Sequence, residues 1–336
     1  MVACAAPSIH ARFAAFHARC SGVDAPIDPF SDVLALLNPK GFLSARLSAG
    51  GDWALRFNGY EGVKFNAVLQ GRCWLAVEGV EHPVALQAGD CYLLTDGRHY
   101  RLASDLALPT EEAAPYFARA TGGVAQVGDT ADVMLMGGRF AFDEAHAAML
   151  LDALPPVVHV PAASAHAGVI QWVLARLADE VSQPAMGATL MADHLAHILF
   201  VQALRAHAAS GGAQAVGWLG ALSEPRLAKA LGLMHGAPAQ RWTVDALASA
   251  AGMSRSTFAG HFKSAVGVAP LDYLLRWRMR LAARELRGGR KTVSAVALSL
   301  GYESESAFSH AFKRVMGAAP MHFKSAAARA PAQPTA

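Results

Sequence analysis

The sequence predicts an α+β protein in three parts: an N-terminal β-barrel or sandwich, a middle helical hairpin and a C-terminal all-α domain with two helix-turn-helix units. Three observations support this fold class. Short β-type runs separated by glycines fill the front of the chain, two long runs with helical periodicity follow, and one helix-turn-helix pattern occurs twice near the end.

The composition is that of a globular protein large enough for about two domains. The chain has 336 residues, 53% of them hydrophobic, and no run of eighteen uninterrupted apolar residues that would span a membrane. His, Arg and polar residues interrupt the N-terminal segment where a secretory leader needs an apolar run. We therefore expect residues 1–26 to be a poorly ordered extension of a cytoplasmic protein.

The charges divide the chain into an acidic front and a basic end. Residues 222–330 hold 16 Lys and Arg against 6 Asp and Glu, a net charge of +10; the remainder holds 13 against 20, a net charge of −7, and the two sum to the overall +3. A basic C-terminal third indicates a polyanionic partner such as nucleic acid.

A repeated pattern lies within this basic third. Thr-Val-x3-Ala-x3-Gly starts at residue 243 and again at residue 292, an offset of 49. Phe-x3-Phe-Lys-x3-Gly-x2-Pro starts at residue 258 and again at residue 308, an offset of 50. The second repeat therefore has one more residue than the first, and the extra residue lies just after the glycine that ends the Thr-Val-x3-Ala-x3-Gly pattern. An insertion at this point marks a turn between two elements of constant length.

Each repeat predicts two helices joined by a tight turn. Apolar residues at 244, 247, 248 and 251, and again at 293, 296, 297 and 300, lie on one helical face. A glycine ends this helix, and Ser254 or Ser304 can cap the next one. This layout is a helix-turn-helix, whose second helix can enter the DNA major groove. Two αα-hairpins in a small bundle are the alternative, but two units in register with a +10 charge favour DNA binding.

Between the units, residues 271–287 predict one long Arg-rich helix that ends at Gly288-Gly289. A rigid connector of this kind would let the two units address successive major-groove faces, about one helical turn apart.

Residues 225–324 resemble the AraC/XylS family of bacterial transcription regulators. The resemblance is carried by WTVDALASAAGMSRSTFAGHFKSAVGVAP and above all by ALSLGYESESAFSHAFKRVMGAAP. The family usually continues with Pro-x-x-Tyr-Arg, where this chain has Phe323 and Lys324 after Pro320. The resemblance implies a DNA-binding domain over 222–324, promoter DNA and RNA polymerase as partners, and helices 254–265 and 304–315 as the recognition helices.

By position in the family's motif, thirteen residues would face DNA. In the first unit they are Arg255, Ser256, Thr257, Ala259, Gly260 and Lys263; in the second they are Ser304, Glu305, Ser306, Ser309, His310, Lys313 and Arg314. Ser256, Ser306 and His310 are the main candidates for base edges, and Lys263, Lys313 and Arg314 are the candidates for phosphates. Glu305 could accept from a cytosine amino group or act only as a first-turn acid.

The front of the chain, from residue 27 to about 110, has short alternating runs with a glycine every eight to twelve residues, which is typical of a β-sandwich or barrel. It resembles the cupin-type sensor domain of many such regulators, on the segments 69–72 (LQGR) and 86–94 (LQAGDCYLL). The resemblance implies a sensor domain over 27–160 that binds an unknown small-molecule effector.

In metal-binding cupins the ligands would stand at the positions of Lys64, Asn66, Gln70 and Tyr100. These residue types do not make a site for a divalent metal, and His99 is one residue out of register. We therefore predict no metal, no cofactor and no enzymatic activity, and an effector pocket instead. Its candidate residues are Trp53, Arg56, Lys64, Asn66, Gln70, Trp74, Tyr92 and Tyr100.

Residues 161–209 predict two helices separated at Pro184, the second with residues 190, 194, 197, 198, 201 and 204 near one stripe. They would form a homodimer interface or pack on the barrel. Asp193, His194 and His197 have a spacing that could reach a metal, with no evident further ligand. Residues 210–221 predict a flexible linker, and 325–336 a disordered tail.

These features predict a ligand-responsive transcription regulator, an activator by expectation, that acts as a homodimer. Two alternatives stay open. One is a cupin-fold enzyme with an accessory DNA-binding module. The other is a redox-sensing regulator that uses Cys73 and Cys91, although the four cysteines show no CxxC pair and are most simply buried thiols.

Overall fold

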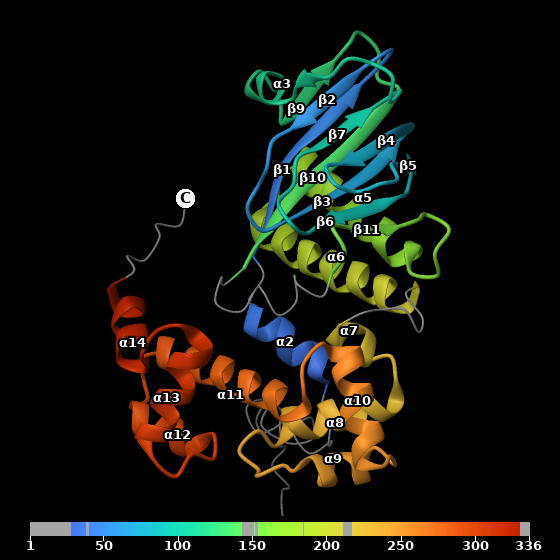
Figure 1. The fold of residues 1–336 in the computed structure, drawn as a ribbon. Helices are drawn as coiled ribbons and strands as arrows, with labels where there is room; N and C mark the ends of the chain where they lie inside the picture. The colour runs from blue at the N-terminus through green and yellow to red at the C-terminus, as the bar shows by residue number, and fades with distance from the viewer. Residues whose placement is uncertain are drawn as a thin grey trace, which may run out of the picture.

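A computed structural model of the chain describes residues 28–37, 40–142, 151, 154–183, 185–210 and 217–329. A sheet-rich N-terminal domain is followed by an all-helical C-terminal domain, which confirms the α+β fold class (Figure 1). The predicted N-terminal extension, 1–26, lies outside the described residues.

Two sheets face each other in the N-terminal domain. The first has the order β11 (Val157–Val160), β6 (Cys91–Leu94), β3 (Val63–Gln70), β10 (Val133–Ala141), β1 (Lys40–Ala49), β9 (Val124–Val127). The second has the order β5 (Val84–Gln87), β4 (Arg72–Val77), β7 (Tyr100–Ala103), β2 (Ala54–Phe57), β8 (Glu111–Glu112). Side chains from both sheets, among them Leu55, Leu75 and Tyr92, fill the interior between them.

Strand β3 separates two environments because successive side chains of a strand point to opposite faces. Val63, Phe65 and Ala67 lie in the apolar cluster beneath the helices. Lys64 and Asn66 lie on the other face and line a cavity between the sheets. One strand therefore touches both the interior of the barrel and the helical layer.

The helical layer consists of α5 (Ala167–Ser182) and α6 (Ala188–Ser210), which pack against each other and cover the first sheet (Figure 1). The buried face of α6 runs through Leu195, Leu199, Phe200 and Ala203. The predicted stripe, for which a dimer interface and a face on the barrel were both left open, lies mostly outside this buried face and shares only Leu204 with it. The helix is apolar on more than one side, so periodicity did not identify the face that meets the sheet.

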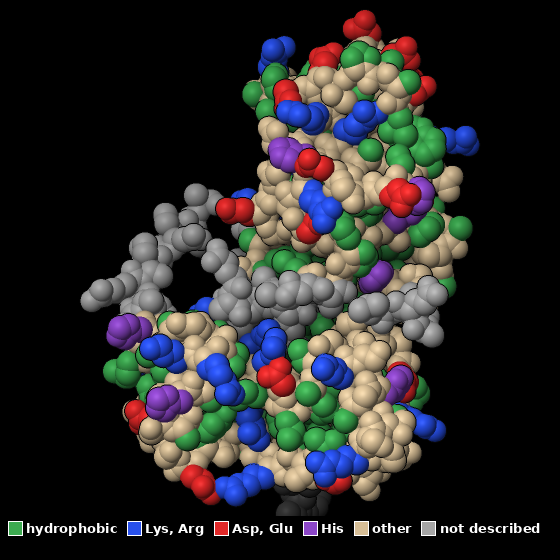
Figure 2. All heavy atoms as spheres, in the orientation of Figure 1, with side chains coloured by type: hydrophobic (Ala, Val, Ile, Leu, Met, Phe, Trp, Pro, Cys, Tyr) green, Lys and Arg blue, Asp and Glu red, His purple; other side chains and the backbone are tan. Residues whose placement is uncertain are grey.

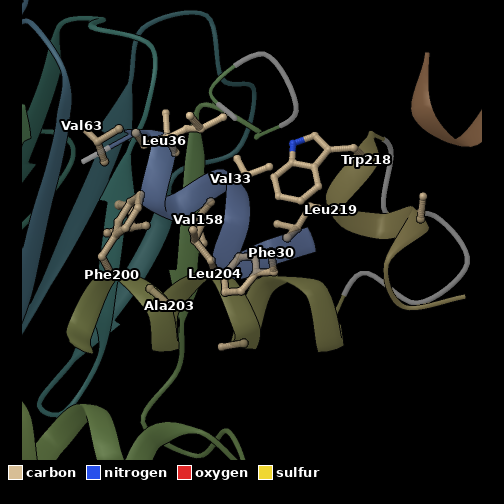
Figure 3. Packing of buried hydrophobic residues seen from close by; sticks show 14 of the residues in the cluster. Phe30, Val33, Leu36, Val63, Val158, Phe200, Ala203, Leu204, Trp218 and Leu219 are labelled. Carbon is tan, nitrogen blue, oxygen red and sulfur yellow. The ribbon is translucent and has the colours of Figure 1, made fainter. Parts of the chain in front are cut away.

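Helix α2 (Pro29–Leu37) connects the N-terminal domain to the C-terminal one. Its Phe30, Val33 and Leu36 are buried in a cluster that also holds Trp218 and Leu219 of the short helix α7 (Trp218–Ala221) (Figure 3). The segment 210–221, predicted to be a flexible linker, is therefore helical at its end. Burial of Trp218 against Phe30, with ring centroids 6.4 Å apart, holds it in place.

A buried histidine lies at the junction between the domains and contacts α2 and α11 (Pro270–Arg287). The His235 ring on α8 (Pro225–Gly236) lies 3.2 Å from Asp32 Oδ2 through Nδ1 and 2.8 Å from Tyr273 Oη through Nε2, and it stacks on Trp277. A carboxylate only accepts, so Nδ1–H donates to Asp32 and the neutral ring accepts from the Tyr273 hydroxyl. Burial lowers the pKa of His235, and the hydrogen bond to Asp32 opposes this shift.

The C-terminal domain contains the two predicted helical pairs. The first pair is α9 (Val244–Ala250) and α10 (Arg255–Val266); the second is α12 (Val293–Ser299) and α13 (Glu305–Met316). Helix α11 (Pro270–Arg287) connects them, and α14 (Pro320–Arg329) follows (Figure 1). Helix α14 continues into the segment predicted to be a disordered tail; residues 330–336 lie outside the described part.

The two pairs belong to different hydrophobic cores. Phe258 and Phe262 of the first pair lie in the cluster that also contains α2, α6 and α7. Phe308 and Phe312 of the second pair lie in a separate cluster with the C-terminal half of α11. The first unit is thus packed into the same core as the helical layer of the N-terminal domain.

Candidate nucleic-acid interface and ligand cavity

The repeated residues of the sequence set the ends of the helices. Thr243 and Thr292 cap α9 and α12, and Ser254 and Ser304 cap the recognition helices α10 and α13, each by accepting a backbone N–H three residues ahead. Gly267 and Gly317 end the recognition helices with left-handed backbones, and Pro270 and Pro320 begin the helices that follow. The same cap and turn residues therefore set the helix ends in both units.

The thirteen residues predicted to face DNA lie at the surface of α10 and α13 and at their first residues. Ala259 and Ser309 are half-buried, because each follows the buried Phe258 or Phe308, and the other eleven are exposed. Both helices therefore present this face to solvent; on α10 it includes Ala259 and Gly260, which have no polar side chain.

Several of these side chains already have partners. Arg255 forms an ion pair with Asp245 of α9 at 3.1 Å. The hydroxyls of Ser256 and Thr257 lie 3.3 and 2.8 Å from Ser254 Oγ at the helix start. Arg255 would have to exchange Asp245 for a base or phosphate in order to contact DNA.

Contacts between the two units hold the recognition helices in a defined relation. From α11, Arg278 donates to the carbonyls of Pro238 and Gln240 in the loop before α9. Arg241 of that loop pairs with Glu303 in the turn between α12 and α13. These contacts link the loop before α9 both to α11 and to the second unit.

The charge distribution of the surface follows the division seen in the sequence. Figure 2 shows Lys and Arg side chains spread over the C-terminal domain, whereas Asp and Glu gather at the far end of the N-terminal domain. Phosphate contacts by such cations supply the sequence-independent part of DNA affinity.

A cavity of about 330 Å³ lies between the sheets of the N-terminal domain. Its apolar wall comes from β1, β2, β7, β10 and the segment after β8, and includes Leu47, Phe57, Leu102, Phe117 and Leu135. The size falls at the lower end of the range for small-molecule sites, roughly 300–1,000 Å³.

Lys64 projects into this cavity among aromatic rings. Its Nζ lies 5.8, 5.0 and 5.1 Å from the ring centroids of Phe57, Tyr60 and Tyr100, and it donates to Tyr100 Oη at 3.3 Å. Burial, followed by the charge of Arg139, lowers the pKa of Lys64. The rings partly replace the water that an ammonium group loses on burial.

Asn66 lies beside Lys64 on the same face of β3. Its Nδ2 is buried and has no hydrogen-bond partner among the described residues. On the facing strand β10, a Cβ at Gly137 would come within 2.3 Å of Asn66 Oδ1, so only glycine leaves room for the amide.

The structure brings four of the eight predicted effector residues together around this cavity: Arg56, Lys64, Asn66 and Tyr100. Arg56 is engaged with Glu112 at 2.9 Å. Trp53 and Tyr92 are packed in the interior instead. Gln70 donates to the Ala131 carbonyl at the surface, and Trp74 lines a separate hollow around Asp90 and His159.

Comparison with known proteins agrees with this architecture. A family profile described as "Cupin" matches residues 28–209, and one described as "Helix-turn-helix domain" matches residues 247–326. An AraC-like transcription regulator of Streptomyces lividans is 48% identical over 89% of this chain and 98% of its own length. This chain belongs to the AraC family of transcription regulators.

Further transcription regulators match most of the chain or part of it. The HTH-type transcriptional regulator AlkR of Acinetobacter baylyi is 30% identical over 86% of this chain and 95% of its own. Among solved structures, the DNA-binding domain of AdpA in complex with a target DNA is 33% identical over 32% of this chain and 97% of its own, with a TM-score of 0.30.

Some residues of this AraC-family protein that line the cavity or contact Lys64 were missed by sequence reasoning. Tyr60 follows β2 in a loop, Phe117 belongs to α3 (Ala114–Ala118), and Gly137 lies on a strand about seventy residues from Asn66. Only Phe57 could be linked to the cavity from its neighbours in the sequence, because it directly follows the predicted Arg56. The others come together through tertiary folding.

The two cysteines of the redox alternative are buried in different clusters, Cys73 between the sheets and Cys91 beneath the helices. Burial, with a smaller effect of Asp90, raises the pKa of each thiol to about 12. Because the thiolate is the reactive form, these surroundings disfavour oxidant sensing at either residue.

Two other features of the described residues bear on site predictions. No group of three His, Cys, Asp or Glu there is placed to hold a metal ion; His197 instead bonds the Asp193 carbonyl through Nδ1. No helix of the described part is both long and apolar enough to cross a bilayer.

Proposed function

We propose that this AraC-family regulator is controlled by a small molecule that binds in the cavity and changes how α10 and α13 are presented to promoter DNA. The observation that carries the proposal is the position of β3. Lys64 and Asn66 line the cavity, while Phe65, on the opposite face, packs in the core shared with the first helix-turn-helix unit. A shift of β3 on binding would therefore reach that core directly.

The linker supports the same coupling. Trp218 of α7 packs on Phe30 of α2, and the Gly217 N–H donates to the Ala265 carbonyl of α10 at 2.9 Å. Packed elements with few alternative arrangements can carry a small shift from one site to another.

The protein acts as a regulator rather than an enzyme. The residues that line the cavity include no Asp, Glu or His. Those are the side chains that acid–base catalysis and metal binding most often use. As a regulator it works in the cytoplasm at its promoter, where it recruits RNA polymerase.

The outer face of the helical layer binds a second copy of the chain. Helices α5 and α6 expose Val169, Trp172, Leu190, Met191 and Ile198, each at least 40% accessible. An exposed apolar face of this kind marks an interaction site. Sedimentation should give a dimer for the parent chain and a monomer for Trp172→Glu combined with Leu190→Glu; a monomeric parent would contradict this part.

DNA binding is tested with the full chain and a duplex from upstream of its own gene. Fluorescence anisotropy at two salt concentrations should show a preference over a shuffled duplex on the order of 10³. Screening of small molecules then follows the change in that affinity. Equal binding of both duplexes would contradict regulation at this promoter.

A further inference from the structure

Two hydrogen-bond donors line the cavity from the same face of β3, and the described residues that line it include no carboxylate. Lys64 Nζ and Asn66 Nδ2 belong to side chains two residues apart on the inner face of β3. Asn66 Nδ2 has no partner among the described residues, although buried amide groups are nearly always hydrogen-bonded. A ligand atom with lone pairs would satisfy it.

The charge of the cavity has one sign. Its lining residues include Arg56 and Lys64 and no carboxylate. Arg56 is paired with Glu112 near the surface, so Lys64 is the cation whose charge lacks a carboxylate partner in the described structure. Three ring faces, one hydroxyl and the like charge of Arg139 surround this half-buried ammonium, so its charge is incompletely compensated. A ligand with one negative charge would balance the charge of Lys64.

The remaining wall is apolar. Phe57, Leu102, Phe117 and Leu135 surround the space next to the donors, within a volume of about 330 Å³. Such a space suits one aromatic ring or a short branched chain.

We propose that the cavity binds a small organic carboxylate, whose oxygens accept from Lys64 Nζ and Asn66 Nδ2 while its hydrocarbon part contacts Phe57, Phe117 and Leu135. This inference rests on the proposed function, because it names the chemical class of the effector. A planar carboxylate offers two oxygens to two neighbouring donors, and its single charge matches the single unpaired ammonium.

The first experiment compares three probes of similar shape on the full chain by isothermal titration calorimetry. Phenylacetate carries the anion, phenylacetamide is its neutral counterpart, and 2-phenylethylamine carries a cation. Phenylacetate should bind on the order of 10- to 100-fold more tightly than the amide, and the amine should bind most weakly. Equal affinity of acid and amide, or no binding of phenylacetate up to about 10 mM, would overturn the proposal.

Variants then test which side chains bind the anion. Lys64→Met keeps the apolar stem and should abolish the preference for phenylacetate over the amide. Asn66→Leu should weaken phenylacetate binding by about 10-fold. Gln70→Leu is the matched control, since Gln70 lies on the same strand but bonds the Ala131 carbonyl outside the cavity. Circular dichroism checks the fold, and an unchanged preference in a folded Lys64→Met protein would overturn the proposal.

The pH dependence gives a readout that does not rely on substitution. Because burial lowers the pKa of Lys64, its ammonium form is lost at a lower pH than for an ordinary lysine. Phenylacetate affinity should therefore fall as the pH rises through this lowered pKa, whereas phenylacetamide affinity should stay constant. A flat profile for both probes would count against Lys64 as the partner.

The two proposals fail differently. If phenylacetate binds through Lys64 but the affinity for the promoter duplex never changes, the carboxylate site stands and control by this cavity is wrong. If only neutral probes bind and they change DNA affinity, control by the cavity stands and the carboxylate site is wrong.

Discussion

Lys313 and His310 are exposed on the same recognition helix, yet we expect them to contribute differently to DNA binding. We expect Lys313, near the end of α13, to contact phosphate, which every sequence offers, and His310 to reach a base edge. Lys313→Ala should weaken binding to specific and shuffled duplexes alike and reduce the salt slope by about 1. His310→Ala should cost affinity for the specific duplex only.

Anisotropy titrations at several salt concentrations measure both effects. Lys324→Ala serves as a control cation, because Lys324 belongs to α14 and donates to the Lys291 carbonyl at 2.9 Å. Loss of specificity in Lys313→Ala, or an equal loss on both duplexes in His310→Ala, would reverse these assignments.

Gly301 and Gly252 occupy the same place in the two units but differ in their surroundings. Both have a left-handed backbone, with φ of 82° and 65°. A Cβ at Gly301 would lie 2.2 Å from the Ala239 carbonyl oxygen, whereas at Gly252 it would meet nothing within 4 Å.

Gly252→Ala should therefore cost about 1–2 kcal/mol of unfolding free energy from backbone strain alone, and Gly301→Ala should cost more because the loop before α9 must also move. Urea denaturation of the two variants measures the difference. Equal losses of unfolding free energy would show that the loop at Ala239 can move aside without a cost in stability.

At the scale of elements, the caps determine where the recognition helices begin. Ser254→Ala removes the acceptor for the Thr257 N–H and should destabilise the first unit by about 1 kcal/mol. Ser264→Ala, at an exposed position within α10, is the matched control and should change stability little. Hydrogen exchange of the first turn of α10 measures this; equal protection in both variants would contradict a capping role.

Helix bounds in the C-terminal domain agree closely with the sequence prediction, because the determinants are local. The recognition helices run 255–266 and 305–316 where 254–265 and 304–315 were predicted, and the connector ends at Arg287 as expected. Thr, Ser, Gly and Pro act on the backbone next to them. For α6 the face that packs on the sheet is decided by strands far away in sequence, and the predicted stripe shares only Leu204 with that face.

At the scale of the whole molecule, the junction at His235 predicts a dependence of stability on pH. The folded-state pKa of His235 is lowered from 6.5 by burial, although Asp32 and Asp28 act in the opposite direction. Below about pH 6.5 the unfolded chain therefore binds the proton more readily than the folded chain does. The contribution of neutral His235 to the free energy of unfolding is complete above that pH and is lost as the pH falls.

Urea unfolding at about pH 7.5 and 5.5, on either side of the ordinary histidine pKa, tests this. The parent chain should lose more stability on acidification than His235→Gln, which keeps a donor and an acceptor but does not titrate. The same loss in both proteins would assign the pH dependence to other groups.

The sequence by itself determined the fold class, the two helix-turn-helix units with their caps, and the polar faces of the recognition helices. Those features depend on residues a few positions apart, whose spacing is visible along the chain. Only the tertiary structure decided which barrel residues share a cavity, that Trp53 and Tyr92 are packed away from it, and that α2 and α7 join the sensor to the first unit. The physical reason is that Lys64, Tyr100 and Gly137 meet only when β3, β7 and β10 fold together, and no local periodicity records which distant strand a side chain will face.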